Sequence, residues 1–372
     1  MNKLSICHLS SAHADGDVRI FHKECVSLSE AGFDVSLVIT NTTSRKEDGV
    51  NIVSFPRATN ARFNRMTKTV FQTYKVAKKI NADVYHFHDP ELMFIGVLLR
   101  LRGKKVAYDV HEDVPKQILD KKWLGPKWFR YVISWLFRAF QWCCCLFYFH
   151  IFTATPEIAK RFNSKKTSVI FNYPIIEYLK NAPKSDYKKT IPSVVYAGGL
   201  TELRGIKKLI LSIGKLNGKV ELWLIGPWES ESFQQECEQS DGFKHTVYFG
   251  KIPLKKVYEY YQIADIGAHT VFPSERHLIG IPTKILECMG IGMPVILTYG
   301  EYWKSFFGNT VKFVDAMDPQ NIADGIKDLI DNPEKTKKMS IEAEKFIIEK
   351  CSWEAECKKL INPYLKLLNQ PI

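Results

Sequence analysis

The stretch GIPTKILECMGIGMP, residues 280–294, joins a helix start, a lysine in the first turn and a single acidic residue. Backbone amides at a helix N-terminus attract anions, so Thr283 and Lys284 are candidate phosphate ligands. Glu287 lies about one turn further on the same side of the helix, where its carboxylate would accept hydrogen bonds from two ribose hydroxyls. The alternative, a solvated helix residue, fits less well because the neighbouring positions are apolar. The pattern predicts a site for a phosphate beside a sugar.

A second candidate anion site follows the strand VVYA. Gly198 and Gly199 come directly after this strand, and Arg204 and Gly205 precede a helix. Glycines let backbone amides approach a ligand closely, and an arginine grips phosphate oxygens with two donors. An ordinary strand–turn–helix is the alternative. The strand LWLIG ends in Gly226 and opens onto the same edge if the strands are parallel. We expect the two helix starts to lie on one side of their sheet and to share a diphosphate.

Strands and helices alternate along the whole chain. Short β-branched runs such as LSICHLS, DVSLVIT and SVVYAGG are separated by amphipathic stretches, and KNAPKSDYKKTIPS reads as a polar linker. This rhythm is typical of parallel sheets covered by helices on both faces, with ligands at the carboxyl ends of the strands. We predict an α/β protein of two doubly wound domains, 1–175 and 191–352, with a linker at 176–190 and a helix at 353–372 that packs back toward the first domain.

Charge is concentrated in the first half of the chain. The formal net charge is +12, and residues 1–180 hold 27 Lys and Arg against 16 Asp and Glu, a balance of +11. An anionic partner is one explanation and a merely basic protein is an equal alternative. No RNP signature, zinc finger or arginine-rich arm indicates nucleic acid. The nine cysteines show no C-x-x-C pair or zinc spacing, which indicates reduced thiols, and the start is too polar for a signal peptide. We expect a cytoplasmic protein.

An aromatic and basic stretch, residues 121–155, stands out in the first half. Its uninterrupted apolar part, 139–149, is shorter than the ~20 residues of a membrane span. Aromatic side chains mixed with basic ones suit a helix that lies on a membrane surface, and a buried helix is an equal alternative. We favour peripheral contact with an anionic leaflet, on the inner face of the plasma membrane. The basic residues are Lys121, Lys122, Lys127, Arg130 and Arg138.

Three segments in this order, YAGGLTELRG, LIGP and PTKILECMGIGMPVI, resemble the nucleotide-sugar glycosyltransferases of family 4. The resemblance covers essentially the whole chain and implies the GT-B fold, in which two Rossmann-like domains face each other across a cleft. It also implies a retaining reaction, with the donor held mainly by the second domain. Because helix-start amides, Arg204 and Lys284 would stabilise the leaving group, we expect no metal or other cofactor. The residues it assigns to the nucleotide sugar are Gly198, Gly199, Arg204, Gly226, Ile252, Thr283, Lys284 and Glu287.

The resemblance gives roles to polar residues of the first half. His111, after the strand KVAYDV, would contact the donor sugar, and it completes a predicted catalytic set with Arg204 and Lys284. Its alternative is a core or capping histidine. His86 and His88 share a strand face and have a spacing that a metal could use, but we assign no metal. A buried His86 and an acceptor-binding His88 are the remaining readings.

The loop SSAHADGDVRIFHKE corresponds to the family's first loop, which meets donor and acceptor. His13, Asp17 and Arg19 are the candidates there, together with Asp89 after the second strand. Asp89 would orient a histidine or hold an acceptor hydroxyl. The D-x-D pattern that ends at Asp17 is short enough to arise by chance, so we do not assign it a metal.

Two positions depart from the family pattern. Gly199 stands where most members have an arginine, so one expected phosphate ligand is missing. Ile279 stands where many members have a glutamate, eight positions before Glu287. The second departure bears more on the identity of the sugar than on the type of reaction.

We therefore expect a transferase that moves a sugar from a UDP- or GDP-linked donor to a glycan acceptor of the polyprenyl-diphosphate-linked kind, in cell-surface polysaccharide (lipopolysaccharide) synthesis. A nucleotide-sugar 2-epimerase of the same fold and a catalytically inactive, membrane-associated binding protein are the alternatives. A dehydrogenase is excluded because no G-x-G-x-x-G follows the first strand. The sequence carries no signal for an oligomeric state.

Overall fold

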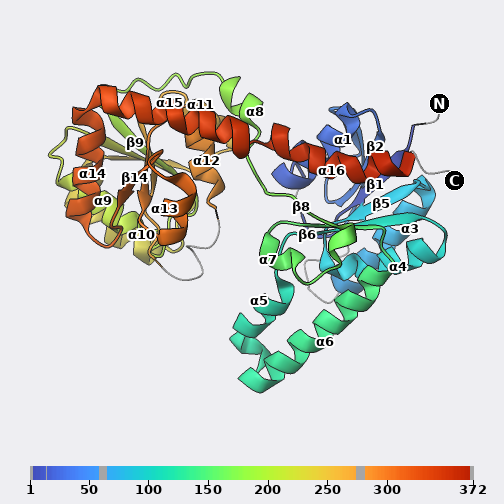
Figure 1. Ribbon diagram of the computed structural model, residues 1–372. Helices are drawn as coiled ribbons and strands as arrows, with labels where there is room; N and C mark the ends of the chain where they lie inside the picture. The colour runs from blue at the N-terminus through green and yellow to red at the C-terminus, as the bar shows by residue number, and fades with distance from the viewer. Residues whose placement is uncertain (1–2, 14, 58–64, 274–280, 369–372) are drawn as a thin grey trace. The chain divides into compact units, whose positions relative to one another are not determined.

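The computed structural model describes residues 3–13, 15–57, 65–273 and 281–368. The chain divides into two compact units, one of Met1–Asn172 with Glu356–Ile372 and the other of Tyr173–Ala355 (Figure 1). Each unit contains one sheet. The segment predicted as a linker belongs to the second unit, and most of the C-terminal helix belongs to the first.

The first unit is built on an eight-stranded sheet of order β3-β4-β2-β1-β5-β6-β7-β8. Neighbouring strands are parallel except β3, which pairs antiparallel with β4. The inner strands are short and almost wholly buried, as expected of a sheet covered on both faces. The strands are β1 (Ser5–Leu9), β2 (Asp34–Thr40), β3 (Arg45–Glu47), β4 (Val50–Phe55), β5 (Val84–Phe87), β6 (Lys105–Val110), β7 (His150–Thr153) and β8 (Thr167–Val169).

Helices cover this sheet, and the first loop is followed by an unusual helical segment. Residues Val18–Cys25 form a π-helix, η1, where the sequence periodicity indicated an ordinary helix. The remaining π- and 3-10 segments are η2 (Arg65–Thr69), η3 (Pro90–Leu92), η4 (Lys122–Leu124) and η5 (Ser164–Lys166). The α-helices are α1 (Val26–Glu30), α3 (Val70–Ile80), α4 (Met93–Leu101), α5 (Val114–Asp120), α6 (Lys127–Leu146), α7 (Pro156–Ala159) and α16 (Trp353–Leu368).

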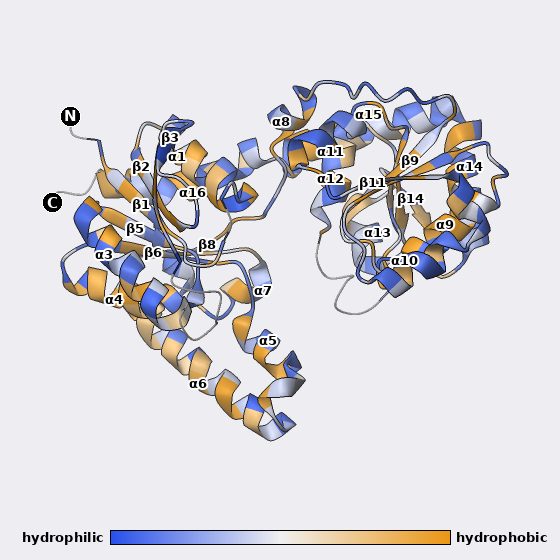
Figure 2. Ribbon diagram, turned by 180° about the vertical axis from the view of Figure 1, so that it is seen from behind, coloured by the Kyte–Doolittle hydropathy of each residue, from blue (hydrophilic) through white to orange (hydrophobic). Residues whose placement is uncertain are grey.

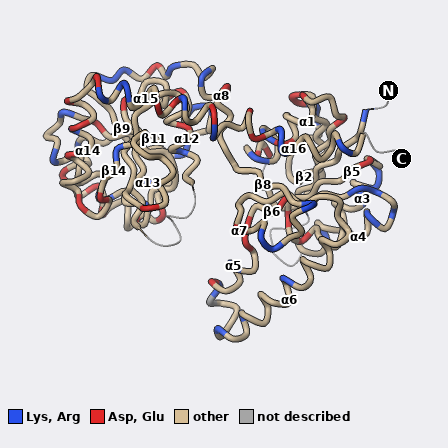
Figure 3. The backbone as a smooth tube through the Cα atoms, viewed as in Figure 1, with Lys and Arg blue, Asp and Glu red and all other residues tan. Residues whose placement is uncertain are grey.

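Helix α6 contains most of the aromatic and basic stretch, and few of its residues are buried. Only Ser134, Gln141, Cys144 and Cys145 are buried along its 20 residues, so the buried-helix alternative is wrong. Together with α5 the helix extends from the body of its unit, and much of its length is apolar (Figure 2). Figure 3 marks its charged positions, which are three basic residues and no acidic one. Its exposed large apolar side chains are Trp128, Phe129, Tyr131, Val132, Trp135, Leu136, Phe140, Trp142 and Leu146.

Within the described ranges, no helix combines the length and the apolar character that crossing a membrane requires.

The second unit is built on a six-stranded, wholly parallel sheet of order β11-β10-β9-β12-β13-β14. The chain moves outward from β9 in one direction and from β12 in the other, so the topology switches between these two strands. At such a switch point the loops on either side diverge and leave room for a ligand at the carboxyl edge. The strands are β9 (Ser193–Ala197), β10 (Glu221–Ile225), β11 (Thr246–Gly250), β12 (Ile266–His269), β13 (Val295–Thr298) and β14 (Lys312–Val314).

The helices of this unit lie on both faces of the sheet. They are α8 (Ile176–Lys180), α9 (Ile206–Gly214), α10 (Glu231–Glu238), η6 (Asp241–His245), α11 (Leu254–Tyr261), α12 (Thr283–Gly290), α13 (Glu301–Phe307), α14 (Pro319–Asp331) and α15 (Pro333–Lys350).

The placement of α9 and α12 corrects one expectation. Helix α9 shares a core with α10 and α14, whereas α12 packs with α8 and α15. Right-handed crossovers that leave a switch point in opposite directions put their helices on opposite faces. The two helices therefore lie on opposite faces of the sheet, whereas the sequence predicted that both would lie on one side. Their N-termini nevertheless both follow strands that end at the same edge.

Candidate active site

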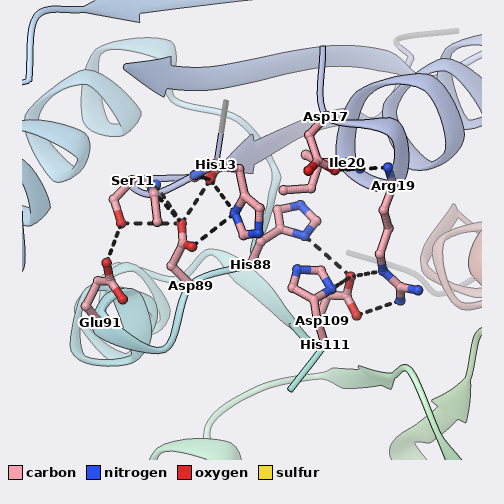
Figure 4. Close-up of polar contacts among 12 residues, drawn as sticks. Ser11, His13, Asp17, Arg19, Ile20, His88, Asp89, Glu91, Asp109 and His111 are labelled. Carbon is pink, nitrogen blue, oxygen red and sulfur yellow. Dashed lines mark hydrogen bonds and ion pairs between the residues drawn. The ribbon is translucent and has the colours of Figure 1, made fainter. Parts of the chain in front are cut away.

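The carboxyl ends of β1, β5 and β6 gather a polar cluster in the first unit (Figure 4). These strands are neighbours in the sheet, so the first loop, His88–Asp89 and His111 come from adjacent strand ends. Asp109 lies one residue before the end of β6 and is fully buried. The structure thus brings together the first-half residues that the sequence singled out.

Asp109 is the central anion of this cluster. Its two carboxylate oxygens accept hydrogen bonds from Arg19, at 3.0 Å from Nε and 2.9 Å from Nη2. The same carboxylate lies 3.0 Å from Nδ1 of His111 and 3.4 Å from Nδ1 of His88. Burial alone would raise the pKa of Asp109, but the positive charge of Arg19 and the histidine contacts hold it well below its usual value. Arg19 also donates to the carbonyl of Ile170 at 3.1 Å, so its donors are committed within the protein.

Three buried histidines extend the cluster inward. His8 Nδ1 lies 2.9 Å from His88 Nε2, and His86 Nδ1 lies 2.8 Å from the hydroxyl of Tyr364 on α16. Burial lowers the pKa of His88 to about 4 and the pKa values of His8 and His86 well below their usual range, so all three are neutral at pH 7. His86 is therefore a buried histidine that contacts the C-terminal helix.

His13 and Asp89 form a separate pair at the mouth of the cluster. His13 Nδ1 lies 3.1 Å from Asp89 Oδ1. The other oxygen of Asp89 accepts hydrogen bonds from the Ser10 hydroxyl at 2.9 Å and the Ser11 amide at 2.6 Å. Burial opposes ionisation of both partners, but their mutual contact raises the pKa of His13 and lowers that of Asp89. Asp17 has a different position: Oδ1 caps η1 by accepting from the amides of Arg19 and Ile20.

Two groups of side chains have the composition of metal ligands. Among the described residues, one nitrogen or oxygen from each member of a group lies within 4.8 Å of the others. Asp109 already neutralises Arg19, and burial raises the pKa of Glu24 well above its usual value, which favours its uncharged acid form. A carboxylate ligand must be ionised, so the group that contains Glu24 is poorly prepared for a cation, and in the other group Arg19 already offsets the charge of Asp109. The groups are His8, Glu24, His86 and His88, and His88, Asp109 and His111.

A pocket of about 730 Å³ opens beside the cluster, wholly within the first unit. One part of its lining comes from the loops after β1, β5 and β6 and is polar, with His13, Asp89 and His111. The other part comes from η2, α4, α5, η4 and α6 and is mostly apolar. The apolar side chains on helices α4 to α6 are Met93, Phe94, Val114, Ile118, Trp123, Leu124, Ile133, Phe137 and Phe140.

In the second unit, two cations meet at the end of β9. A Cβ atom built on Gly198 would lie 2.8 Å from Nζ of Lys284 and 3.0 Å from Nη1 of Arg204. Lys284 donates to the carbonyl of Ala197, and Arg204 reaches the hydroxyl of Tyr196 at 3.5 Å. Neither cation forms an ion pair with a carboxylate of the described residues. Burial lowers the pKa of Lys284, although the nearby Glu287 offsets part of this effect.

Two positions at this edge require glycine, because a backbone carbonyl oxygen of another residue lies where a Cβ atom would be. Gly226 has φ +139°, and a Cβ there would lie 1.9 Å from the carbonyl oxygen of Gly198. Gly205, the N-cap of α9, has φ +71° and a Cβ there would lie 2.0 Å from the carbonyl oxygen of Thr270. Gly199 leaves room for the guanidinium of Arg204, whose Nη1 lies 3.4 Å from the position of a Cβ atom. Arg204 therefore occupies space beside the position where the family pattern has its own arginine.

Glu287 and Thr283 lie on α12 as the sequence predicted. Thr283 is the first residue of the helix, and Glu287 is half-buried between buried apolar neighbours. Its Oε1 accepts a hydrogen bond from the hydroxyl of Tyr258 at 3.3 Å. Ile252 is half-buried just after β11, at the carboxyl edge of the sheet. Ile279 lies outside the described residues.

Sequence reasoning missed the residues that hold the first cluster together. Asp109, Glu24 and His8 are not among the site residues that the sequence predicts. An ionisable residue within an otherwise apolar strand, as in KVAYDV, is a signal of a buried and paired charge. The partner, Arg19, is 90 positions away, and only the strand order reveals it.

Two family models match the chain. The model described as Glycosyltransferase Family 4 matches residues 15–165, and the model described as Glycosyl transferases group 1 matches residues 178–346. One model falls on each sheet. The chain belongs to the glycosyltransferases that combine these two domains, which confirms the family that the sequence motifs indicated. A comparison with curated proteins gave no significant match.

Solved structures share the fold over almost the whole chain. Sucrose-phosphate synthase from Thermosynechococcus elongatus has a TM-score of 0.72 at 15% identity, covering 99% of this chain and 100% of that one. HepE from Anabaena, in complex with UDP and glucose, has a TM-score of 0.69 at 14% identity, covering 96% and 98%. A structure described as a UDP-N-acetylglucosamine 2-epimerase from Listeria monocytogenes has a TM-score of 0.59 at 12% identity, covering 91% of each chain. These likenesses confirm the predicted GT-B fold of two Rossmann-like domains.

Proposed function

We propose that this glycosyltransferase moves a sugar from a UDP- or GDP-linked donor to a glycan acceptor, with retention of the anomeric configuration. The observation that carries the proposal is the meeting of Arg204 and Lys284 at Gly198, at the switch point of the second sheet. Two cations without an anionic partner among the described residues suit a diphosphate. Related folds were solved with UDP, UDP-glucose or ADP, which supports this class of donor.

Departure of the diphosphate is the step that these groups assist. The acceptor hydroxyl oxygen forms a bond to the anomeric carbon as the bond between that carbon and the phosphate oxygen breaks. Negative charge develops on the leaving oxygens, and the leaving phosphate accepts the hydroxyl proton. Arg204, Lys284 and the amides at the start of α12 would stabilise that charge, with roughly 2.7–4 kcal/mol for a well-placed donor. This positive potential makes a metal ion unnecessary in the proposed mechanism. Glu287 would hold the ribose hydroxyls, with Gly226 and Ile252 lining the nucleotide.

The first unit would receive the acceptor. His111 is proposed to contact the donor sugar, and His13, His88 and Asp89 to face the acceptor. Helix α6 supports an acceptor that is lipid-linked, because its exposed aromatic and basic side chains suit the surface of an anionic leaflet. We therefore place the enzyme in the cytoplasm, attached to the inner face of the plasma membrane, in synthesis of a cell-surface polysaccharide. Release from acidic vesicles at high salt would be the signature of this attachment.

The test of the function combines binding with product analysis. The purified chain is first screened with UDP, GDP, ADP and CMP, because a ligand of the folded state raises the melting temperature. The nucleotide that binds selects the sugar donors, which are then incubated with acceptor extracts in the presence and absence of EDTA. Acceptor-dependent release of nucleoside diphosphate, unchanged by EDTA, with an α-linked product from an α-linked donor, is the expected result. A β-linked product or loss of activity in EDTA would contradict retention or metal independence, respectively.

An epimerase is the second candidate, because the same fold occurs in the structure described as a 2-epimerase. An altered sugar without any acceptor would identify that activity. Nucleotide-sugar binding with no product under any condition would instead indicate an inactive binding protein.

A further inference from the structure

The pocket in the first unit has two chemically different walls, and its polar wall is acidic. Among the residues that the structure describes, Asp89, Glu91 and Glu112 line it, Lys121 is the one lining lysine and no arginine belongs to the lining. Negative charge at the wall disfavours an anionic group in the ligand. Hydroxyl groups, in contrast, are good donors to carboxylate and histidine acceptors. The polar wall therefore fits an uncharged, hydroxyl-rich group such as a sugar.

The His13–Asp89 pair supplies a fixed hydrogen-bonding group on this wall. Asp89 is 2% exposed and is held by the Ser10 hydroxyl and the Ser11 amide. In neutral His13, donation of Nδ1–H to Asp89 leaves the free lone pair on Nε2, and in the imidazolium form, which Asp89 favours, Nε2–H is a donor. His13 itself lines the pocket, so this nitrogen is available to a ligand hydroxyl.

The apolar wall continues to the surface of α6. Phe94, Trp123 and Phe140 line the pocket and are 57%, 68% and 46% exposed. Exposed apolar side chains of this size would lose contact with water if an apolar chain lay against them. Leu136, on the same helix and 54% exposed, does not line the pocket.

We propose that this pocket binds an uncharged sugar that carries an apolar chain, with the sugar against His13 and Asp89 and the chain against α4 and α6. The inference rests on the proposed transfer function, because it describes the acceptor of that reaction. It implies that a lipid phosphate is not the group next to the His13–Asp89 pair: at least one neutral sugar separates them. The enzyme would then extend an existing glycolipid rather than glycosylate a lipid phosphate directly, and another transferase must supply that first sugar.

The binding test uses a series of alkyl glucosides below their micelle concentrations. Methyl, butyl, hexyl and octyl glucoside are titrated into the full chain by calorimetry, with octyl phosphate as the anionic probe and octanol as the probe without a sugar. We expect affinity to rise about 3- to 4-fold for each methylene that becomes buried. Octyl glucoside should bind at least about 10-fold more tightly than octyl phosphate, since the wall is acidic. Equal affinity along the series, or tighter binding of octyl phosphate, would overturn the inference.

Variants locate the two ends of the ligand. Phe140→Ser and Phe94→Ser should weaken octyl glucoside binding about 10-fold and leave methyl glucoside unchanged, since each removes apolar contact. Leu136→Ser is the matched control, with no expected effect; an equal loss in this variant would mean adsorption to the surface of α6 and would contradict the proposed site. His13→Ala should remove the preference for octyl glucoside over octanol. A preference retained in this variant would contradict the placement of the sugar.

Failure of the inference is separable from failure of the proposed function. Nucleoside diphosphate binding is measured on the same preparation. If the nucleotide binds and transfer proceeds but chain length has no effect, the pocket assignment is wrong and the transferase function stands. If chain length matters but neither nucleotide binding nor transfer occurs, the pocket assignment stands and the function is wrong.

Discussion

The two sheets carry opposite arrangements of charge at their carboxyl edges. In the first unit, Arg19 and Asp109 neutralise each other through two hydrogen bonds and are both buried. In the second unit, Arg204 and Lys284 meet at Gly198 and have neutral acceptors such as Tyr196. In a buried ion pair, each charge is neutralised by its partner within the fold. Cations that lie together without an anion create a positive electrostatic potential that attracts an anionic ligand. The pairing of Arg19 with Asp109 thus stabilises the structure, and the meeting of Arg204 and Lys284 is suited to bind an anion.

This difference also separates the two kinds of histidine in the first unit. His8 and His86 are fully buried and neutral and are not among the lining residues of the pocket, so they belong to the structural part of the cluster. His13, His88 and His111 line the pocket. Substrate contacts in this unit are therefore expected at these three histidines, with His8 and His86 holding the strand ends and α16 in place.

The largest effect is expected where the structural arrangement is broken. Asp109→Ala would remove the ionised partner of the buried Arg19 and leave it only the Glu24 carboxyl, 3.1 Å from Nε. Removing one partner of a buried ion pair costs about 3–5 kcal/mol. We expect this loss in the free energy of unfolding, measured with urea. Asp109→Asn retains a hydrogen-bond acceptor and should lose less. A loss below about 1 kcal/mol in the alanine variant would show that water or another group replaces the carboxylate.

A smaller effect is expected where the second edge depends on close backbone packing. Gly226→Ala places a methyl group 1.9 Å from the carbonyl oxygen of Gly198, at φ +139°. We expect a loss of about 1–3 kcal/mol in stability from this strain, together with weaker nucleotide binding. Gly250→Ala is the control, since φ there is +70° but nothing lies within 4 Å of the added methyl group. Chemical unfolding should rank Gly226→Ala as the more destabilising change, and the reverse order would contradict the packing argument.

The smallest effect concerns the pH dependence of the His13–Asp89 pair. The folded pKa of His13 is raised above its unfolded value near 6.5 by Asp89. The pair therefore contributes full stability below pH 6.5, and this contribution is lost as the pH rises through the folded pKa. His13→Gln can still donate to Asp89 but does not titrate. Unfolding curves from pH 5.5 to 8.5 should show the wild type losing stability relative to this variant as the pH rises; parallel curves would mean that the pair does not stabilise the imidazolium.

Much of the second edge was predictable because its residues belong to contiguous motifs. Gly198, Arg204 and Lys284 each lie within a few residues of a strand end or helix start, so local patterns place them. Their meeting follows from a parallel sheet, since all strands end at the same edge. The faces of α9 and α12 were not predictable, because they depend on the strand order at the switch point.

The contacts at the carboxyl edge of the first sheet were less predictable, because they too depend on the strand order. Arg19 and Asp109 meet only because β1, β5 and β6 are adjacent in the sheet, and alternation of strands and helices does not specify that order. The contact between His86 and Tyr364 joins residues 278 positions apart. The exposure of α6 also required the structure, because its composition suited both a buried and a surface helix.

The cations at the end of β9, Arg204 and Lys284, are proposed to bind a diphosphate. Calorimetry should compare the nucleoside diphosphate found in the screen with the corresponding nucleoside, in the wild type, Lys284→Met, Arg204→Met and the control Lys215→Met, which removes an exposed lysine at the other end of α9. We predict that the diphosphate binds about 100-fold more tightly than the nucleoside in the wild type and control, and that each site variant loses at least about 10-fold of this advantage. An advantage that survives both site variants unchanged would contradict the account.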